Sequence, residues 1–223
     1  MAAPAAPTFL ELVQRRERGK LKLYVGMAAG VGKTYRMLQE AHDLRRRGVD
    51  VVAGYVESHG RAETEAQLGD LEVVPRARIA YRGVTLEEMD LAAVVDRRPQ
   101  VALVDELAHT NVPGSPNAKR WQDVMRLLDE GINVISAVNV QHLESLGDVM
   151  ERELGVTVRE TVPDWVVAQA DQVVNLDLSA EDLRQRLREG KIYPADRIET
   201  ALANFFTDEN LSTLRELALR ELA

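Results

Sequence analysis

The sequence predicts an α/β fold, in which a mostly parallel sheet has helices on both faces and an all-helical C-terminal extension follows. Three observations favour this fold. Short apolar runs alternate with stretches of helical periodicity over residues 20–176. A glycine-rich loop at residues 26–34 joins the first apolar run to the first helical stretch. After residue 178 only helical patterns follow, which predicts the extension.

Six apolar runs have the length expected of strands in a sheet that is buried on both faces. They cover residues 20–25, 50–56, 78–81, 101–104, 133–138 and 172–176. Between them, helices are expected over residues 32–47, 62–71, 85–96, 120–129 and 143–154. The third of these helices is placed at Thr85 because Thr85 and Glu88 have the spacing of a capping box.

Three helices are expected in the extension because each has a residue suited to its start. Ser179 is placed to cap a helix that ends at Gly190, Pro194 can open the next, and Thr207 a third. Residues 19–178 are therefore expected to form the α/β domain, with residues 179–223 packed on it as a helical extension. The first residues, 1–18, are interpreted as a partly disordered leader.

The loop Gly-Met-Ala-Ala-Gly-Val-Gly-Lys-Thr at residues 26–34 has the context of a phosphate-binding P-loop, because it follows a strand and opens a helix. Gly30 and Gly32 let backbone N–H groups approach phosphate oxygens. Lys33 would place its charge on the β- and γ-phosphates, and the Thr34 hydroxyl would bind Mg²⁺. The sequence predicts a P-loop NTPase-like fold that binds a nucleoside triphosphate through Gly26, Ala29, Gly30, Val31, Gly32, Lys33 and Thr34.

The glycine spacing of this loop differs from the usual pattern, G-x-x-x-x-G-K-[ST], by one position. Met27 occupies the place of the first glycine, and Gly26 lies one residue early. Two interpretations follow. Either the loop is one residue longer than usual, or Met27 fits because that position keeps a negative φ. A glycine-rich turn without a ligand is the simpler alternative, which the strand–loop–helix context disfavours.

A second motif is the apolar strand at residues 101–104, which ends in Asp105 and Glu106. Ligands bind beyond the carboxyl ends of parallel strands, so Asp105 would share a site with Thr34 and hold Mg²⁺ beside the phosphates. Glu106 is the candidate catalytic residue, placed to orient or activate a water molecule. The alternative for Asp105 is a loop acid that caps the following helix.

Several other charged residues are weaker candidates. Glu106 and His109 have a metal-site spacing, but a hydrogen-bonded loop histidine is the preferred interpretation of His109. His59 follows the second strand, where a switch residue is often found, and the pair Gln141–His142 follows a later one. Basic residues that could stabilise phosphate charge, or simply lie on the surface, are Arg61, Lys119 and Arg120.

Composition narrows the class of protein further. The 223 residues carry a net charge of −8, which argues against a broad nucleic-acid-binding surface. The chain has no cysteine, so it has no disulfide and no thiolate site, and this composition fits a reducing cytoplasm. No apolar run approaches the length of a membrane span, and the first residues lack the pattern of a signal peptide.

Long motifs of this sequence resemble the N-terminal cytoplasmic domain of KdpD, the family of membrane sensor histidine kinases of bacterial potassium homeostasis. One is the loop with its early glycine. Another is Val-Glu-Ser-His-Gly-Arg at residues 56–61. Further matching stretches cover residues 105–115, 119–123, 139–146, 162–171 and 201–206. The resemblance extends over about residues 19–223, and it makes the offset of Gly26 a property of the family's loop.

The resemblance implies an ATP-binding regulatory domain that uses Mg²⁺ and modulates the kinase and phosphatase activities of a distant catalytic core. Its partners would be the rest of the sensor kinase in cis and, through the parent protein, a response regulator. No membrane span, dimerisation helix or kinase core occurs within the 223 residues. Autophosphorylation is therefore not expected of this chain, and an expressed fragment and a stand-alone homologue are both open.

Three function classes stay open beside one another. The first is a regulatory nucleotide sensor, in which ATP moves the loops near residues 57–61 and 105–115. The second is an autonomous NTPase or small-molecule phosphotransferase that uses Lys33, Asp105 and Glu106. The third is an α/β scaffold that binds a partner or another nucleotide, such as a cyclic dinucleotide, and in which the glycine-rich loop is vestigial. The sequence does not distinguish which base is bound or whether ATP is hydrolysed.

Overall fold

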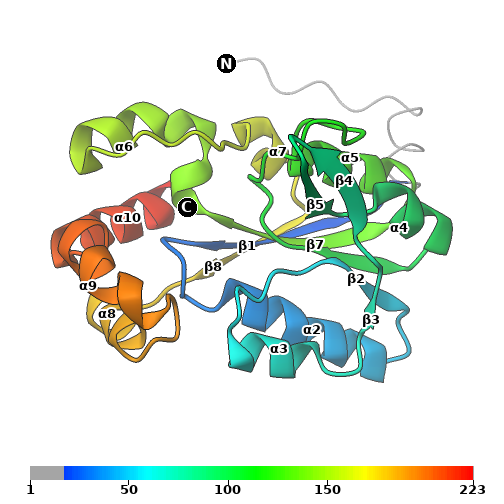
Figure 1. Ribbon diagram of the computed structural model, residues 1–223, viewed down its shortest axis with the longest axis horizontal. Helices are drawn as coiled ribbons and strands as arrows, with labels where there is room; N and C mark the ends of the chain where they lie inside the picture. Colours follow the sequence, from blue (N-terminus) through cyan, green and yellow to red (C-terminus); the bar gives the residue numbers. More distant parts are fainter. Residues whose placement is uncertain (1–17, 223) are drawn as a thin grey trace, which may run out of the picture.

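The structure is a computed structural model that describes residues 18–222. Its centre is a sheet of six parallel strands in the order β3-β2-β6-β7-β1-β8 (Figure 1). The strands are β1 (Leu21–Gly26), β2 (Val51–Tyr55), β3 (Glu72–Val73), β6 (Val101–Val104), β7 (Asn133–Asn139) and β8 (Gln172–Leu176). This sheet confirms the predicted α/β fold. The leader expected over residues 1–18 lies, apart from its last residue, outside the described part of the chain.

Helices cover both faces of the sheet (Figure 1). On one face, α2 (Lys33–Arg46) and α3 (Ala62–Leu68) enclose a core that includes Met37, Leu38, Ala53 and Leu103. The opposite face carries a larger core under α4 (Leu91–Arg97), α5 (Arg120–Asp129) and α6 (Gly147–Leu154). Shorter elements complete this side: the 3-10 turns η1 (Val140–His142) and η2 (Glu144–Leu146), and α7 (Asp164–Ala168).

The C-terminal helices begin where the sequence predicts. They are α8 (Ala180–Arg188), α9 (Ala195–Asn204) and α10 (Asp208–Glu221). Ser179 caps α8 by accepting from the Asp182 N–H at 3.0 Å, and Thr207 caps α10 in the same way. Their buried side chains, among them Leu183 and Phe206, belong to the same core cluster as strand β1. The extension therefore packs directly on one end of the α/β body (Figure 1).

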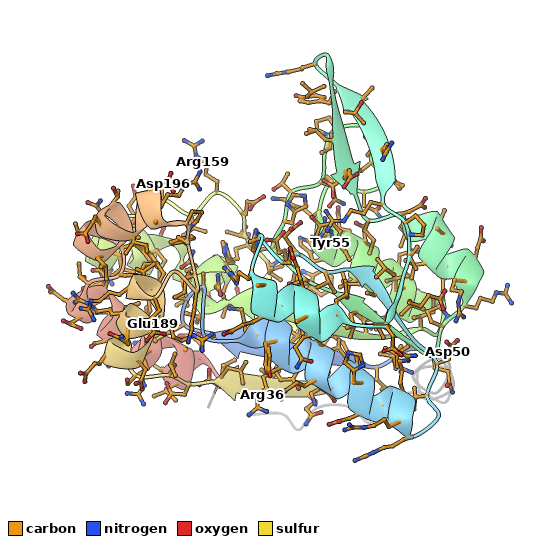
Figure 2. All side chains as sticks on the ribbon, turned by 60° about the horizontal axis from the view of Figure 1, so that its bottom comes forward. Arg36, Asp50, Tyr55, Arg159, Glu189 and Asp196 are labelled. Carbon is orange, nitrogen blue, oxygen red and sulfur yellow. The ribbon has the colours of Figure 1, made fainter. Side chains whose placement is uncertain are left out.

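Two predictions are wrong between residues 77 and 90. The stretch expected as a strand of the main sheet is β4 (Ala77–Tyr81), which pairs with β5 (Val84–Glu88) in a separate antiparallel hairpin. The helix expected from Thr85 begins only at α4, where Asp90 accepts from the Ala93 N–H at 2.9 Å. Figure 2 shows the hairpin projecting away from the body.

Two features stabilise the hairpin, the backbone conformation of its turn and a buried contact at the end of β5. Arg82 and Gly83 at the turn have φ values of 49° and 81°, the left-handed conformation that two-residue hairpin turns require. Glu88 does not close a capping box, because its buried carboxylate binds Arg120 at 2.7 Å. That long-range contact outweighs the local capping signal.

The strand order brings the two predicted motifs to one edge of the sheet. Strand β1 leads into the glycine-rich loop and β6 into Asp105, and β7 lies between them. Gly26 at the end of β1 is in register with Asn139 at the end of β7. Because all of these strands are parallel, their carboxyl ends face the same side of the molecule. Within residues 18–222, every helix is too short or too polar to cross a membrane.

Candidate functional site

A cavity of about 710 Å³ lies at the carboxyl ends of β1, β2, β6 and β7. Its wall combines the glycine-rich loop, defined here as residues 26–34, with the segments that follow β2, β6 and β7. The connection between α8 and α9 closes the remaining side, through Gly190, Lys191, Ile192, Tyr193 and Pro194. The sequence predicts the first part of this wall but not the contribution of the extension.

The glycine-rich loop has the backbone conformation that an anion-binding turn needs. Gly30 and Gly32 have φ values of 92° and 97°, in the left-handed region that side chains disfavour. Gly32 stands at the N-cap of α2, and among residues 18–222 no side chain caps the first turn of this helix. The N–H groups of that turn therefore have no side-chain acceptor in this part of the chain, and Gly32, Lys33 and Thr34 line the cavity at this point.

The offset of the first glycine has a structural explanation. Met27 is buried, with 2% of its surface exposed, and it is not among the described residues with positive φ. A Cβ atom at Gly26 would lie 2.4 Å from Cγ2 of Val31, so the end of β1 is packed tightly beneath the loop. This geometry favours the interpretation in which Met27 fits without a longer loop. Gly26 and Val31 themselves do not line the cavity.

Lys33 is held at the base of the cavity by two oxygen atoms. Its ammonium donates to the carbonyl oxygen of Ala28 at 3.0 Å and to the side-chain oxygen of Asn139. Burial lowers the pKa of Lys33 to about 8, although the nearby charge of Asp105 opposes this effect. An anion in the cavity would stabilise the charged form of Lys33, so the position of this ammonium group suits anion binding.

Thr34 and Asp105 meet at the edge of the cavity, as the sequence predicts. The hydroxyl of Thr34 donates to Oδ2 of Asp105 at 2.8 Å, and the N–H of Glu106 donates to Oδ1 at 2.9 Å. Asp105 is only 5% exposed. Burial raises the pKa of Asp105, while the bonds from Thr34 and Glu106 and the charge of Lys33 act in the opposite direction.

The Thr34–Asp105 pair fits a magnesium ion in the donor chemistry it offers. A hydroxyl and a carboxylate are the oxygen ligands that Mg²⁺ prefers. Within residues 18–222, no cluster of three histidine, cysteine or acidic side chains could enclose a metal without help. Magnesium usually keeps several waters and takes phosphate oxygens as further ligands, so a pair of this kind is sufficient. The two residues would then hold the ion beside a bound phosphate chain.

Glu106 lies beside Asp105, where the sequence predicts a candidate catalytic residue. Its carboxylate contacts Nε2 of His59 at 3.0 Å, and both side chains adjoin the cavity. Both residues have positive φ, 55° for Glu106 and 51° for His59, which is uncommon for side-chain-bearing residues. Burial opposes the ionisation of Glu106, but the bond from His59 and the charges of His59, His109 and Arg120 together outweigh it and lower the pKa of the carboxyl group. That same bond raises the pKa of His59.

The remaining sequence candidates separate into two groups. Arg61 and His142 line the cavity. Lys119 instead donates to the Thr110 hydroxyl at 2.7 Å, and Arg120 is completely buried against Glu88. His109 also lines the cavity, and it is hydrogen-bonded to Glu88 at 2.8 Å, in agreement with the preferred interpretation of a loop histidine.

Sequence reasoning missed Arg186, which lines the cavity from helix α8. No motif indicates it, because α8 is expected to lie in an extension far along the chain from the loop. Its only sequence signal is its spacing of three residues from Leu183, a buried residue on the same helix. Tyr193 was missed for the same reason.

The fold and the cavity define an α/β protein with a glycine-rich loop, a lysine and a hydroxyl–carboxylate pair at the carboxyl edge of a parallel sheet. Residues 17–223 match the family KdpD, described as the osmosensitive K⁺ channel histidine kinase sensor domain. The chain belongs to this family, which confirms the resemblance found in its motifs.

Named relatives agree with this assignment. The sensor protein KdpD of Mycobacterium tuberculosis (strain H37Rv) is 54% identical over 207 residues, which are 93% of this chain and 24% of that protein. The sensor protein KdpD of Escherichia coli (strain K12) is 54% identical over 220 residues, or 99% and 25%. The putative sensor protein KdpD of Synechocystis is 54% identical over 206 residues, or 92% and 56%.

The chain therefore spans about a quarter of the length of the first two relatives. Among solved structures, a Pif1 helicase chain from a study of DNA unwinding at forked DNA is similar to it with a TM-score of 0.31 and 13% identity. That match covers 88% of this chain and 51% of the other. A likeness at this level is too weak to bear on the fold or the function.

Proposed function

We propose that this chain is an ATP–Mg²⁺-binding regulatory domain of a potassium-responsive sensor histidine kinase. In this proposal the loop at residues 26–34 acts as a P-loop, and the domain modulates the kinase and phosphatase output of the longer parent protein. The kinase modules of that parent are its partners in cis, and a response regulator is reached only through them. A domain that reads ATP would lie on the cytoplasmic side, where ATP is supplied.

The observation that carries the proposal is the convergence of three side chains from two distant motifs. Lys33 and Thr34 open helix α2, Asp105 follows β6, and all three line one cavity. The cavity volume of about 710 Å³ lies within the range of roughly 300–1,000 Å³ typical of small-molecule sites. A lysine, uncapped helix N–H groups and a hydroxyl–carboxylate pair are together what a triphosphate with magnesium requires.

A regulatory role is favoured over efficient catalysis by the state of Glu106. A general base works best when its pKa lies near the operating pH. Although burial raises the pKa of Glu106, the bond from His59 and the nearby positive charges lower it below its ordinary value. The segments that carry these two residues follow β2 and β6 and line the cavity, so bound nucleotide would move both together. Movement of these segments is the signal that the parent kinase would read.

An autonomous NTPase or small-molecule phosphotransferase is the second candidate function. It is favoured by one observation, the presence of an acidic side chain in the cavity directly beside Asp105. If Glu106 is released from His59, it has the chemistry needed to activate a water molecule.

Calorimetry with ATP–Mg²⁺ on the wild type and on Lys33→Ala, with product analysis of the same samples, tests the proposal. We expect binding of one ATP per chain to the wild type, negligible product, and a loss of affinity of about 100-fold in Lys33→Ala. Equal, weak binding to both proteins would contradict the P-loop assignment. Many turnovers per chain would favour the enzyme over the sensor.

A further inference from the structure

We propose that Arg61 and Arg186 form the second half of the anion site, and that a bound triphosphate fastens the C-terminal helices to the glycine-rich loop. This inference rests on the proposed function, since it assigns a place to the phosphates of ATP. It adds two binding residues and names the element through which the bound state reaches the rest of the chain.

Arg61 and Arg186 line the same cavity, although they lie far apart in the sequence. Arg61 precedes helix α3, and Arg186 lies in the last turn of α8. They are close enough for the charge of Arg186 to lower the pKa of Arg61, an effect that adds to the larger one of burial. Like charges repel, so this arrangement is unfavourable unless an anion binds between or beside them.

Neither arginine has a carboxylate partner within residues 18–222. Within these residues the side chain of Arg61 makes one hydrogen bond, from Nη2 to the carbonyl oxygen of Ile192 at 3.3 Å. The Nε atoms of both side chains are buried without a hydrogen-bond partner in this part of the chain. Buried donors are nearly always satisfied in folded proteins, so these two unpaired donors beside the cavity point to a ligand there.

The nearest acidic groups are already engaged elsewhere. Asp105 accepts from Thr34 at 2.8 Å, and Glu106 pairs with His59 at 3.0 Å. Asp105 and Glu106 favour the charged form of Arg61 from a distance, without forming an ion pair with it in the described residues. Guanidinium groups bind phosphate oxygens through paired N–H donors, and a triphosphate carries enough charge to satisfy both arginines.

The extension is also in direct contact with the glycine-rich loop. A Cβ atom built on Gly30 would lie 2.2 Å from Cδ1 of Ile192 and 3.2 Å from Cδ1 of Leu183. Leu183 lies one helical turn before Arg186, so the apolar contact and the arginine share one face of α8. The same loop that would hold the phosphates therefore supports the helix that supplies Arg186.

Bound triphosphate then joins three elements by charge: the glycine-rich loop, the segment after β2, and α8. Without it, the described residues of the extension contact the loop through apolar side chains, and the hydrogen bond from Arg61 to Ile192 joins the extension to the segment after β2. When triphosphate occupies the site, helices α8–α10 are therefore attached more tightly to the body. A ligand shifts a conformational equilibrium only if it binds one state more tightly than the other. The contact between Arg186 and phosphate provides this difference in affinity, because it forms only when α8 is attached to the body.

The experiment compares the wild type with Arg186→Gln and with Arg188→Gln, a control at an exposed arginine on the same helix that does not line the cavity. ATP–Mg²⁺ and inorganic triphosphate are titrated into each protein by calorimetry. We expect affinity for both ligands to fall about 10- to 100-fold in Arg186→Gln, because each charge-assisted bond is worth that much. Arg188→Gln should match the wild type within about twofold.

Hydrogen exchange on the same proteins measures attachment of the extension. At saturating ATP–Mg²⁺, amides of residues 183–194 should exchange more slowly in the wild type and in Arg188→Gln, but not in Arg186→Gln. If the wild type binds ATP without protecting these residues, the inference is overturned whatever the variants do. Equal affinity of Arg186→Gln and Arg188→Gln for inorganic triphosphate would overturn it as well.

Lys33→Ala distinguishes this inference from the function on which it rests. Loss of ATP binding in Lys33→Ala, together with wild-type binding by Arg186→Gln, would retain the P-loop and refute the role of Arg186. Absence of binding to the wild type itself would refute the proposed function. The side chain of Arg186 makes no hydrogen bond or ion pair within the described residues, so its replacement should leave the melting temperature of the ligand-free protein within about 2 °C.

Discussion

The hydroxyl of Thr34 lies 2.8 Å from Oδ2 of Asp105, although 71 residues separate the two in the sequence. Thr34 lies at the start of α2, which follows β1. Asp105 directly follows β6, which is two strands away from β1 in the sheet. The direct hydrogen bond joins the two oxygen ligands that a magnesium ion would take in common. The glycine-rich loop and the acidic strand end are thus parts of one site.

The first prediction concerns this pair. Asp105→Asn and Thr34→Ala should each reduce the affinity for ATP about 10- to 100-fold in the presence of Mg²⁺, because each removes one oxygen ligand of the ion. In excess EDTA, the variants and the wild type should bind ATP about equally. Calorimetry with and without Mg²⁺ measures both values.

Thr34→Ser is the matched control for the first prediction, since it keeps the hydroxyl and should retain most of the affinity. A loss of affinity that is the same with Mg²⁺ and with EDTA would show that the pair shapes the loop and does not bind the ion.

The second prediction concerns pH and Lys33. The pKa of Lys33 is lowered by burial to about 8, and bound phosphates would raise it again. Below pH 8 the ammonium is charged with and without ligand, so affinity should not depend on its titration. Above pH 8 the free protein loses this proton and must regain it on binding, so affinity should fall by up to about tenfold per pH unit.

Calorimetry in two buffers with different ionisation enthalpies checks this sign directly. Close to one proton should be taken up per ATP at pH 9, and almost none at pH 7. Phosphate monoesters titrate near pH 6, so the ligand contributes little at either value. Proton release at pH 9 would contradict the assignment of Lys33 to the anion site.

The third prediction concerns the His59–Glu106 pair. His59→Asn should increase the slow turnover of ATP about three- to tenfold while ATP affinity stays the same, because Glu106 becomes a better base without its partner. Asparagine is a suitable replacement since it tolerates the φ of 51° found at this position. Turnover is measured by phosphate release at saturating ATP–Mg²⁺.

His42→Asn serves as a control, because His42 lies outside the cavity and contacts the carbonyl oxygen of Gln67. Glu106→Gln should remove the turnover in either background. A decrease in turnover in His59→Asn would mean that His59 orients Glu106 and does not restrain it.

The fourth prediction concerns stability. Arg120 is completely buried, lies 2.7 Å from Glu88, and has its guanidinium 3.8 Å from the centre of the Tyr55 ring. Arg120→Met should lower the free energy of unfolding by about 3–5 kcal/mol, since the carboxylate of Glu88 would stay buried without its arginine partner. Denaturant unfolding followed by circular dichroism measures the change.

Arg126→Met on the same helix is the matched control, because Arg126 is exposed and forms only a surface ion pair with Glu130. Its cost should lie below about 1 kcal/mol. Similar costs for the two variants would mean that the buried pair contributes little to the hairpin and to the loop after Asp105.

Much of the fold follows from the sequence because its signals are local. The apolar runs before Asp105 and around residues 133–138 predict buried strands, and the caps at Ser179 and Thr207 predict helix starts within a residue. The hairpin at residues 77–88 could not be predicted in this way. Its cause is the contact between Glu88 and Arg120, which are 32 residues apart.

The residues of the candidate site also divide into those with a local sequence signal and those without one. Lys33, Thr34 and Asp105 belong to contiguous motifs whose chemistry is readable from spacing, and the structure brings them together. Arg186 belongs to no motif. It reaches the cavity only because α8 packs on Gly30, and nothing in the local sequence of α8 indicates that contact.

The central claim is that the loop at residues 26–34 and the acidic strand end bind ATP with Mg²⁺ while helix α8 closes the site. An electron-density map of crystals grown with a non-hydrolysable ATP analogue and Mg²⁺ tests it most directly. The account predicts phosphates along residues 29–34, the ion beside Thr34 and Asp105, and the Arg186 guanidinium on a phosphate oxygen. Nucleotide bound elsewhere on the molecule, with the cavity of residues 29–34 empty, would contradict it.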